Sequence, residues 1–437
     1  MKNSAWIGAA GLFSVGNGSL FSSCSGKKER SSFIIPELSE EAIDGKELKA
    51  GIIGCGGRGS GAAFNFLSAG KGLTITALAD TFEDRINNLA DRLKNEKNID
   101  IPLAKRFVGL DAYKKLIDSD VDVVIMATPP AFRPVHFKYA TEKGKHSFLE
   151  KPVCIDPVGY RNALVTAKQA EVKKLSVLTG IQYRYQHSYI ESLRKIKEGW
   201  IGEITGGNLY YNQGMLWYRD RNPLWSDGEW MIRDWVNWKW LSGDHIVEQH
   251  IHNLDIFCWF TEQKPVSALG FGSRQRRITG DQYDNFSVDF VMENGIHLHS
   301  MCRQIDGCAN NVSDFIQGTK GSWSSEGKEY VIKDLNQKII WKYDKEAEQN
   351  TYKQTNPYIL EHVDWINHIR SGKTINQVPQ ALISNMAAIM GRESAYSGTL
   401  VTWDQMAASP LDYTPQDLSL GKMDMSKFVV PVPGTKR

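Results

Sequence analysis

The chain has 437 residues, which is long for a single hydrophobic core and predicts two domains with additional segments. Its 41% hydrophobic and 23% charged residues are ordinary for a soluble globular protein, and a formal net charge of +2 gives no reason to expect a nucleic-acid partner. The six cysteines are scattered without a C-x-x-C pair, which argues against a zinc knuckle and a disulfide framework.

Residues 1–33 are typical of an export segment rather than of the folded body. Small and apolar residues dominate 5–21, and the stretch 19–26 resembles a bacterial lipoprotein processing site in which Cys24 becomes the lipidated first residue. We therefore expect an exported protein, periplasmic or anchored to a membrane by lipid at Cys24. A disordered leader on a cytoplasmic protein is the alternative.

The apolar run 48–54 leads directly into a glycine-rich turn, G-x-G-x-x-G, at 54–59. Gly54 lets the chain leave the strand in a tight turn, Gly56 lets the backbone approach a pyrophosphate, and Gly59 lets helix and strand pack closely. The N-terminus of the following helix offers free N–H groups to the phosphates. In this context the motif predicts a Rossmann domain that binds a dinucleotide.

Asp80 ends the second apolar run, at 73–79. A carboxylate at this distance, about 20 residues after the glycines, accepts hydrogen bonds from ribose hydroxyls and repels a 2′-phosphate. We therefore expect NAD rather than NADP. Because free NAD is not expected outside the cytoplasm, an exported enzyme should fold around its cofactor and hold it tightly between turnovers.

Strand-like and helical patterns alternate over 46–180. Strands are expected at 48–54, 73–79, 121–127, 146–149 and 175–178, and helices at 61–69, 82–94, 110–117, 134–143 and 157–171. This rhythm predicts a doubly wound parallel sheet with helices on both faces. Its ligand is expected at the C-terminal edge of the strands, where Pro129 and Pro130 end one of them.

The pattern changes at about residue 182. Strands are expected at 204–212, 266–271, 285–292, 297–302, 314–318 and 321–330, and helices at 246–260 and 358–370 on one side of them. This predicts an α+β domain over 181–405 with a mostly antiparallel, open-faced sheet. The open face needs cover, so we expect a homo-oligomer, dimer or tetramer. A further helix at 380–397 precedes a proline-punctuated C-terminal arm, 406–437, expected to lie over the body or over a partner subunit.

Five segments together resemble the glucose–fructose oxidoreductase / inositol dehydrogenase (Gfo/Idh/MocA) family over about residues 46–405. They are the glycine-rich turn, Ala127-Thr128-Pro129-Pro130 followed by His136, Glu150-Lys151-Pro152, Gly180–Tyr185, and Gly243–Asp255. The resemblance makes the second domain the one that binds substrate and forms oligomers. It implies cofactor contacts from Gly54, Gly56, Gly57, Arg58, Gly59, Asp80, Thr128, Pro129, His136, Glu150, Lys151 and Gln182.

Lys151 and His252 are the main catalytic candidates that the resemblance implies. An ammonium beside the nicotinamide holds a substrate hydroxyl and stabilises the alkoxide as hydride leaves, which is the role given to Lys151. Imidazole is the natural proton acceptor near neutral pH, so His252 is expected as general base. Glu248, one helical turn before it, is expected to orient His252 or to bind a neighbouring sugar hydroxyl. A surface lysine before a turn is the structural alternative for Lys151.

A metal site is the competing interpretation of the histidine-rich stretch, because His245, Glu248 and His252 could share one helix face as zinc ligands. The dehydrogenase pattern already explains two of them, so we expect no metal. His245 and His250 are expected to be structural.

Arg184, Tyr185 and Trp235 are further candidates for binding the substrate. Arg184 is expected either to bind substrate oxygens or to form a structural ion pair, and Tyr185 is equally open. Trp235 is one of six tryptophans between Trp217 and Trp240, in a stretch expected to be a long loop. Their rings would wall a carbohydrate site or plug the core or a subunit contact.

The leading functional hypothesis is an NAD-dependent oxidoreductase that moves hydride to or from a secondary hydroxyl of a sugar, glycoside or cyclitol. The alternative is an NAD-dependent glycosidase that oxidises a ring carbon, eliminates the aglycone and regenerates its cofactor. The histidine-glycine motif that distinguishes such enzymes is not evident. A third hypothesis is a cofactor-bound sugar-binding protein without turnover.

Overall fold

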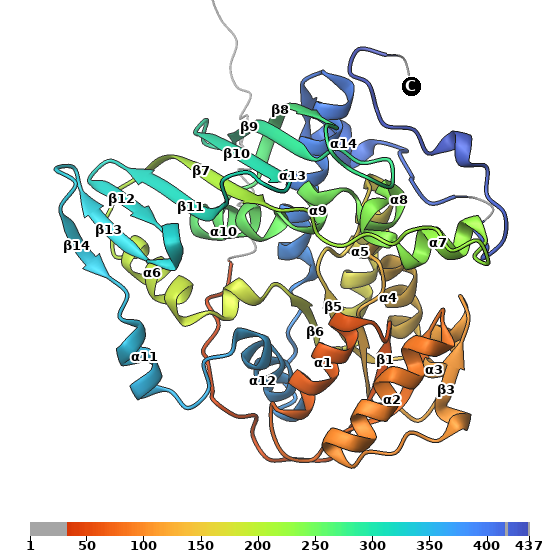
Figure 1. The fold of residues 1–437 in the computed structure, drawn as a ribbon. Helices are drawn as coiled ribbons and strands as arrows, with labels where there is room; N and C mark the ends of the chain where they lie inside the picture. Colours follow the sequence, from red (N-terminus) through yellow and green to blue (C-terminus); the bar gives the residue numbers. More distant parts are fainter. Residues whose placement is uncertain (1–32, 416–417, 436–437) are drawn as a thin grey trace, which may run out of the picture. The chain divides into compact units, whose positions relative to one another are not determined.

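A computed structural model describes residues 33–415 and 418–435 of the chain, which are organised around two β-sheets (Figure 1). The export segment predicted at 1–33 and its lipidation site at Cys24 lie outside the described residues, except for Phe33. Within the described part, none of the helices combines the length and the hydropathy needed to cross a bilayer.

The first sheet is a six-stranded parallel sheet with the order β3-β2-β1-β4-β5-β6. Its strands are β1 (Leu48–Ile53), β2 (Leu73–Asp80), β3 (Arg106–Val108), β4 (Val123–Met126), β5 (His146–Glu150) and β6 (Val177–Gly180). The direction of winding reverses between β1 and β4, and such a switch point is where doubly wound sheets bind their ligands. Ile53 at the end of β1 pairs with Ala79 of β2 and Met126 of β4, so these strands finish at one edge.

Helices cover both faces of this sheet, as predicted. They include α1 (Gly57–Leu67), α2 (Glu83–Lys97), α3 (Ala112–Ile117), α4 (Arg133–Glu142) and α5 (Pro157–Val172). Ile52 and Ile53 of β1 belong to two separate buried clusters, because successive side chains of a strand point to opposite faces.

The position of α12 (Pro357–Arg370) differs from the prediction, which placed this helix against the second sheet. Its buried Leu360 and Trp365 instead share a cluster with Ile52 of the first sheet. The Trp365 indole N–H also donates to the Ser176 carbonyl, at 3.2 Å, just before β6. An amphipathic pattern identifies the apolar face of a helix, but it does not say which sheet that face will cover.

The second sheet has nine strands in the order β14-β13-β12-β11-β7-β10-β9-β8-β15. They are β7 (Ile204–Gln213), β8 (Pro265–Ser273), β9 (Asn285–Met292), β10 (His297–Gln304), β11 (Asn311–Gly318), β12 (Gly321–Ser324), β13 (Val331–Asp334), β14 (Ile339–Lys342) and β15 (Val401–Thr402). All neighbours are antiparallel except β7 and β10, which confirms the mostly antiparallel prediction. Two helices, α10 (Ile251–Thr261) and α13 (Val378–Ser397), pack on one face. Phe271 on β8 is 70% exposed, and oligomerisation through the open face stays a prediction.

The prediction of a single helix at 246–260 is wrong. The chain forms two helices there, α9 (His245–Glu248) and α10, with a break between them. The His250 N–H bonds to the His245 carbonyl five residues back, so the backbone widens at this point. Glu248 and His252 therefore belong to different helices, and they are not successive side chains on one face.

The tryptophan-rich stretch begins after β7 and is partly helical. We call residues 214–237 the strap; it contains α7 (Asp227–Arg233) and a short 3-10 turn, η4 (Trp235–Asn237), and α8 (Lys239–Ser242) follows it. Other helices are η3 (Gln182–Tyr185), α6 (His187–Lys197), α11 (Lys345–Thr351) and α14 (Trp403–Ala408).

The C-terminal arm, drawn in dark blue in Figure 1, lies over the strap of its own chain. Backbone and side chains join the two: the Gly228 N–H donates to the Gly421 carbonyl at 2.9 Å, and the Met423 N–H donates to Asp227 Oδ2 at 3.0 Å. A Cβ at Gly228 would lie 2.1 Å from the Ser419 carbonyl oxygen, so only glycine permits this close approach. The arm was predicted to lie over the body or over a partner subunit. In the structure it lies over the body of its own chain.

Candidate active site

A cavity of about 410 Å³ lies at the C-terminal edge of the first sheet. The predicted cofactor residues that line it are Gly54, Gly56, Gly57, Arg58, Asp80, Thr128, Pro129 and His136. They lie at the end of β2, just after β1 and β4 or, in the case of His136, on α4 (Arg133–Glu142), at the edge where the sheet topology predicts a ligand.

The glycine-rich turn has the geometry that a dinucleotide needs. Gly54 has a φ of +91°, a conformation that favours glycine, and a Cβ on Gly59 would lie only 1.7 Å from the Gly54 carbonyl oxygen. A Cβ on Gly56, by contrast, would meet no atom within 4 Å. Gly59 thus allows close packing of helix and strand, while Gly56 faces open cavity where a phosphate group fits.

Asp80 is held in place at one end of the cavity. Its Oδ2 accepts the Cys55 N–H at 2.6 Å, and its Oδ1 accepts the Phe82 N–H at 3.0 Å. Burial raises the pKa of this carboxyl, and the two backbone hydrogen bonds oppose that shift. Each oxygen keeps a free lone pair, so the fixed carboxylate can still accept a ribose hydroxyl.

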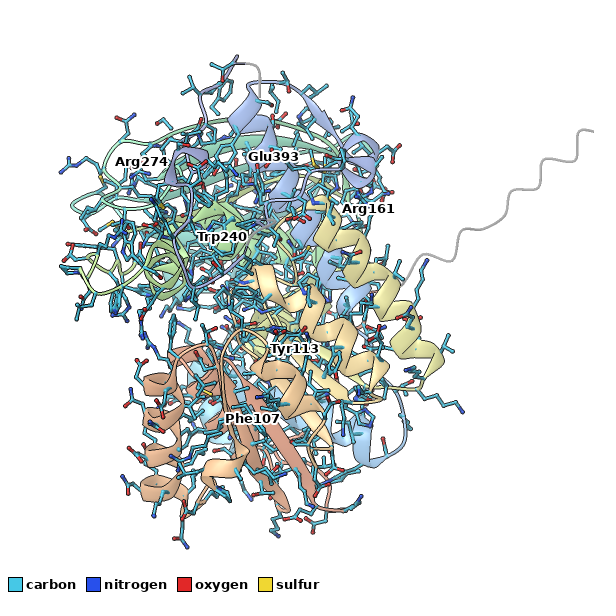
Figure 2. The ribbon with its side chains drawn as sticks, turned by 90° about the vertical axis from the view of Figure 1, so that its right-hand side faces the viewer. Phe107, Tyr113, Arg161, Trp240, Arg274 and Glu393 are labelled. Atoms are coloured by element: carbon cyan, nitrogen blue, oxygen red, sulfur yellow. The ribbon has the colours of Figure 1, made fainter. Side chains whose placement is uncertain are left out.

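His136 forms an aromatic wall rather than a charged one. Its ring lies 4.2 Å from the ring of Tyr113, labelled in Figure 2, and 6.1 Å from the ring of Phe132. Burial, with a contribution from Arg133, lowers the pKa of His136 to about 3, so the imidazole is neutral. A neutral, packed ring suits the flat side of a nucleotide better than a charged one.

The strap closes the cavity at its Asp80 end, where Trp217, Arg219, Arg233 and Trp235 face the first domain. The Arg233 guanidinium pairs with Asp84 at 3.1 Å and lies 3.8 Å from the centre of the Phe82 ring. Trp235 lines the same cavity as the predicted cofactor residues, and its role in binding substrate stays a prediction.

Two other tryptophans of this stretch, Trp238 and Trp240, are buried beside α8 and do plug the core. Both rings contact Phe428 of the C-terminal arm, and Trp240 is labelled in Figure 2. Sequence alone could not separate these structural tryptophans from the two that line the cavity.

Lys151 and Glu248 form a nearly buried ion pair between the two domains. Lys151 Nζ lies 2.8 Å from Glu248 Oε1 and also donates to the Glu248 backbone carbonyl. The side chains are only 13% and 9% exposed. Glu248 therefore orients Lys151, which corrects the prediction that it orients His252.

His252 lies beside this pair and is neutral. Burial lowers its pKa well below the usual range, and the positive charges of Lys151 and Arg58 lower it further. Its Nδ1 is buried and has no hydrogen-bond partner among the described residues, while its ring packs 5.0 Å from that of Tyr183. The structure thus brings Lys151, Glu248 and His252 into one neighbourhood, with a neutral imidazole able to accept a proton.

Arg58 and Glu150, both predicted to bind cofactor, are paired with each other. The Arg58 guanidinium also lies 3.5 Å from Glu361 Oε1 and 4.4 Å from the ring centre of Tyr358. Neither carboxylate oxygen of the fully buried Glu361 has a hydrogen-bond partner among the described residues, and burial raises its pKa well above the usual value. Arg58 lines the cavity and Glu150 does not, so Glu150 is connected to the cavity lining by its pair with Arg58.

Of the two roles left open for Arg184 and Tyr185, the structure has the structural one, since both side chains bond to other residues of the protein. Arg184 makes a bidentate pair with Asp255, 2.7 Å for each bond, and is only 2% exposed. The Tyr185 hydroxyl donates to Asp364 at 2.8 Å. Gln182 is buried at the start of η3 and lies outside the cavity lining.

Three tyrosines near the site were missed: Tyr183, Tyr211 and Tyr358. Their elements are far apart in sequence, and a lone tyrosine in a strand or helix carries no functional signal of its own. Only the assembled fold brings them together.

The metal interpretation finds no support in the geometry. His245 Nδ1 bonds to Asp244 at 2.9 Å and His250 Nε2 bonds to Ser300 at 2.6 Å, so both are structural, as predicted. In the described ranges no group of three or more His, Cys, Asp or Glu side chains is arranged to hold a metal ion.

Comparison with known proteins agrees with this geometry. Residues 48–179 match the profile described as "Oxidoreductase family, NAD-binding Rossmann fold" (GFO_IDH_MocA), and residues 190–324 match the "GFO/IDH/MocA C-terminal domain". Scyllo-inositol dehydrogenase from Lactobacillus casei, solved with NAD(H) and scyllo-inositol, has the same fold, with a TM-score of 0.61 and 18% identity over 82% of this chain and 99% of that one.

Several curated relatives carry the name glycosyl hydrolase family 109 protein. The one from Solibacter usitatus is 31% identical over 44% of this chain and 42% of its own length, and the one from Shewanella pealeana is 23% identical over 72% and 71%. The chain thus spans less than half the length of the more identical relative. With both domain profiles matched and together covering more than half of the sequence, the chain belongs to the Gfo/Idh/MocA oxidoreductase family.

Proposed function

We propose that this protein is an NAD-dependent glycosidase that cleaves a sugar linkage through transient oxidation of the sugar ring. The observation that carries the proposal is the Lys151–Glu248 pair beside a neutral His252, next to a nucleotide cavity that the strap covers. Relatives named glycosyl hydrolases favour hydrolysis over net oxidation.

The glycine-rich turn and Asp80 would hold the dinucleotide by its phosphates and ribose. When bound, its nicotinamide supplies a two-electron acceptor that turns a ring C–OH into a ketone and later returns the hydride. The Lys151 ammonium would hold the reacting hydroxyl oxygen and stabilise its negative charge. His252 would accept the hydroxyl proton, because its imidazole is neutral.

A ring ketone makes the neighbouring C–H acidic, so a base can remove that proton while the C–O bond to the aglycone breaks. Glu248 is the carboxylate in position to take this proton, since its Oε1 lies 2.8 Å from Lys151 Nζ. Water then adds to the resulting double bond, and the returned hydride restores the hydroxyl. The sum is hydrolysis, with no net change in the redox state of the cofactor.

Retention of NAD through the cycle is part of this proposal. Arg233, Trp217 and Trp235 of the strap stand over the Asp80 end of the cavity, and the C-terminal arm packs against the strap. A cofactor that is restored in every turnover does not need to leave, which also suits an exported protein. Asp80 favours NAD over NADP, even though Arg85 and Arg219 line the same end of the cavity.

A net sugar or cyclitol dehydrogenase is the second candidate. It is favoured by the absence of the histidine-glycine motif and by the spacing of Glu248 and His252, which resembles that of inositol dehydrogenases. The two candidates differ in their balance of electrons, because a dehydrogenase leaves reduced nicotinamide while a glycosidase does not.

One experiment separates the candidates. The purified holoenzyme is denatured to identify its bound nucleotide, and the native enzyme is incubated with a panel of glycosides and free sugars. The proposal expects stoichiometric NAD and released sugar without lasting absorbance at 340 nm. Accumulated NADH with an oxidised sugar would favour the dehydrogenase, and absence of any bound or binding nucleotide would refute both.

A further inference from the structure

Tyr183, Tyr211 and Tyr358, which we call the tyrosine cluster, come from three elements that meet beside the candidate catalytic residues. They belong to η3, β7 and α12 respectively. None of them lines the nucleotide cavity. The cluster is therefore separate from the lining of that cavity.

The ring of Tyr183 is fixed next to His252. The two ring centres are 5.0 Å apart, with an angle of 40° between the planes. Behind it, the ring of Tyr189 stacks on Tyr183 at 5.0 Å, and the Tyr189 hydroxyl donates to Asp314 at 2.8 Å. This backing leaves Tyr183 little freedom to turn away from the site.

Tyr211 follows Leu209 on the face of β7 that the helices cover, because side chains alternate along a strand. Its ring lies 6.2 Å from that of His250, at the break between α9 and α10. Burial raises the pKa of Tyr211, and the Glu248 carboxylate and Tyr358 raise it further, so these groups are neighbours.

Tyr358 completes the cluster from the first turn of α12. The Arg58 guanidinium lies 4.4 Å from its ring centre, which fixes one face of the ring. Tyr358 is 36% exposed, whereas Tyr183 and Tyr211 are half-buried. The cluster is thus open to solvent on one side and bordered by charged groups on the other.

The hydroxyls of the three tyrosines are free to bind a ligand. None of them makes a hydrogen bond to another residue in the part of the chain that the structure describes. Burial raises the pKa of each, so each hydroxyl stays protonated and can donate as well as accept. Aromatic faces with free hydroxyls match the chemistry of a sugar ring, which has apolar C–H faces and polar edges.

We propose that the tyrosine cluster binds the part of the substrate beyond the reacting ring, a second pyranose unit of a disaccharide or longer glycoside. This inference rests on the proposed function for the reacting ring itself. It adds that two sugar rings contribute to affinity. Lys151, Glu248 and His252 bind the reacting ring, and the tyrosine cluster binds the second ring.

The test compares matched ligands by titration calorimetry on the holoenzyme. Each pair shares a reacting ring and differs beyond it: methyl β-D-glucopyranoside with cellobiose, and methyl β-D-galactopyranoside with lactose. The variants are Tyr358→Leu, which removes an aromatic face, and Tyr211→Phe, which removes a hydroxyl. Tyr210→Phe is the control, since Tyr210 is the next residue of β7 and points to the opposite face.

We expect Tyr358→Leu to weaken disaccharide binding about tenfold and Tyr211→Phe about fivefold, with less than a twofold change for the methyl glycoside of the same pair. Tyr210→Phe should match the wild type for both ligands. Bound nucleotide per chain and melting temperature show whether each variant is folded.

The subsite is overturned if a variant loses the same affinity for the disaccharide and for its methyl glycoside, or if neither variant loses affinity. If turnover of glycosides is seen but the variants do not discriminate, only this inference fails. If no saccharide of the panel binds or reacts with the wild type, the proposed function fails and the subsite fails with it.

Discussion

Among the described residues, Glu248 is the one side chain that bonds to Lys151, through an ion pair that is almost closed to solvent. Removing one member of a buried pair leaves the other charge without compensation, which costs more than the pair contributes as a whole. The residues of the site are therefore best tested by substitutions that keep the size of the side chain.

Lys151→Met keeps the length of the side chain but removes its ammonium. We expect kcat to fall by about 10² to 10³, because one donor to a developing alkoxide contributes on this scale. Bound NAD should be unchanged, since Lys151 does not line the nucleotide cavity. Lys97→Met, on the exposed end of α2, is the control. Wild-type kcat in Lys151→Met would remove Lys151 from the catalytic residues.

Glu248→Gln keeps an oxygen acceptor for Lys151 and removes the carboxylate charge. If Glu248 takes the proton next to the ring ketone, glycoside cleavage should fall at least about 10²-fold, within the range usual for loss of a general base. Exchange of that ring proton with deuterium from solvent, followed by NMR, should be lost in parallel. Cleavage without a change in exchange would show that Glu248 only positions Lys151.

His250 gives a prediction about pH and stability. Burial and His245 lower its pKa to about 3 in the folded protein, against about 6.5 in the unfolded chain. Below 6.5 the unfolded chain binds a proton that the folded protein does not, so the free energy of unfolding drops as pH falls. The contribution of this one residue between pH 7.5 and 5.5 is about 1.4 kcal/mol.

His250→Gln removes that proton site and can still bond to Ser300. The stability of the variant relative to the wild type should therefore rise by about 1.4 kcal/mol on going from pH 7.5 to 5.5, whatever its absolute value. Urea unfolding at the two pH values measures the difference. A constant offset between the two proteins would mean that His250 titrates alike in both states.

At the scale of elements, the strap is joined to α2 by the ion pair of Arg233 with Asp84. The two side chains are 15% and 51% exposed, so the pair contributes less than about 1 kcal/mol. Asp84→Asn should speed the release of bound NAD up to about fivefold, measured by gel filtration at intervals after dilution.

The control for Asp84→Asn is Glu96→Gln, which breaks the pair of Arg92 with Glu96 on the same helix but away from the strap. This change should leave nucleotide release unaltered. Equal release from wild type and Asp84→Asn would show that the strap does not limit the exit of NAD through this contact.

Elements also show what could be read from the sequence. The glycine-rich turn and Asp80 were predicted correctly in position because their function depends on local backbone geometry and short spacing. The strands of the first sheet were found because buried parallel strands are continuous apolar runs.

What failed were predictions that needed tertiary contacts. The break between α9 and α10 leaves the hydrophobic pattern intact, so Glu248 and His252 seemed to share a helix. The sequence left two roles for Arg184, binding substrate or forming a structural ion pair. The choice depends on its partner Asp255, which is 71 residues away in the chain. The place of Trp235 likewise depends on how the strap folds back onto the first domain.

At the scale of the whole molecule, the C-terminal arm packs Phe428 against Trp238 and Trp240, which directly follow the strap. Phe428 is only half-buried, so Phe428→Ala should lower the free energy of unfolding by about 2 kcal/mol, below the range for a fully buried phenylalanine. Val429→Ala, at a neighbouring exposed position, is the matched control.

The same variant should also lose bound NAD faster than the wild type, because Phe428 packs on Trp240, whose ring lies 6.3 Å from that of Phe132 in the cavity lining. Denaturing release and quantification of nucleotide after dialysis measures this effect. Lower stability with full retention of NAD would separate the arm from cofactor binding and leave it a purely structural element.

The position of the arm has a consequence for the biogenesis of the enzyme. Residues 418–435 are translated after every segment that lines the cavity, and their docking fastens the strap. On the proposed function, the nucleotide is expected to enter before this last docking step. Each molecule would then bind NAD once and keep it. Protein that is refolded without nucleotide should therefore bind NAD added afterwards at a slow rate.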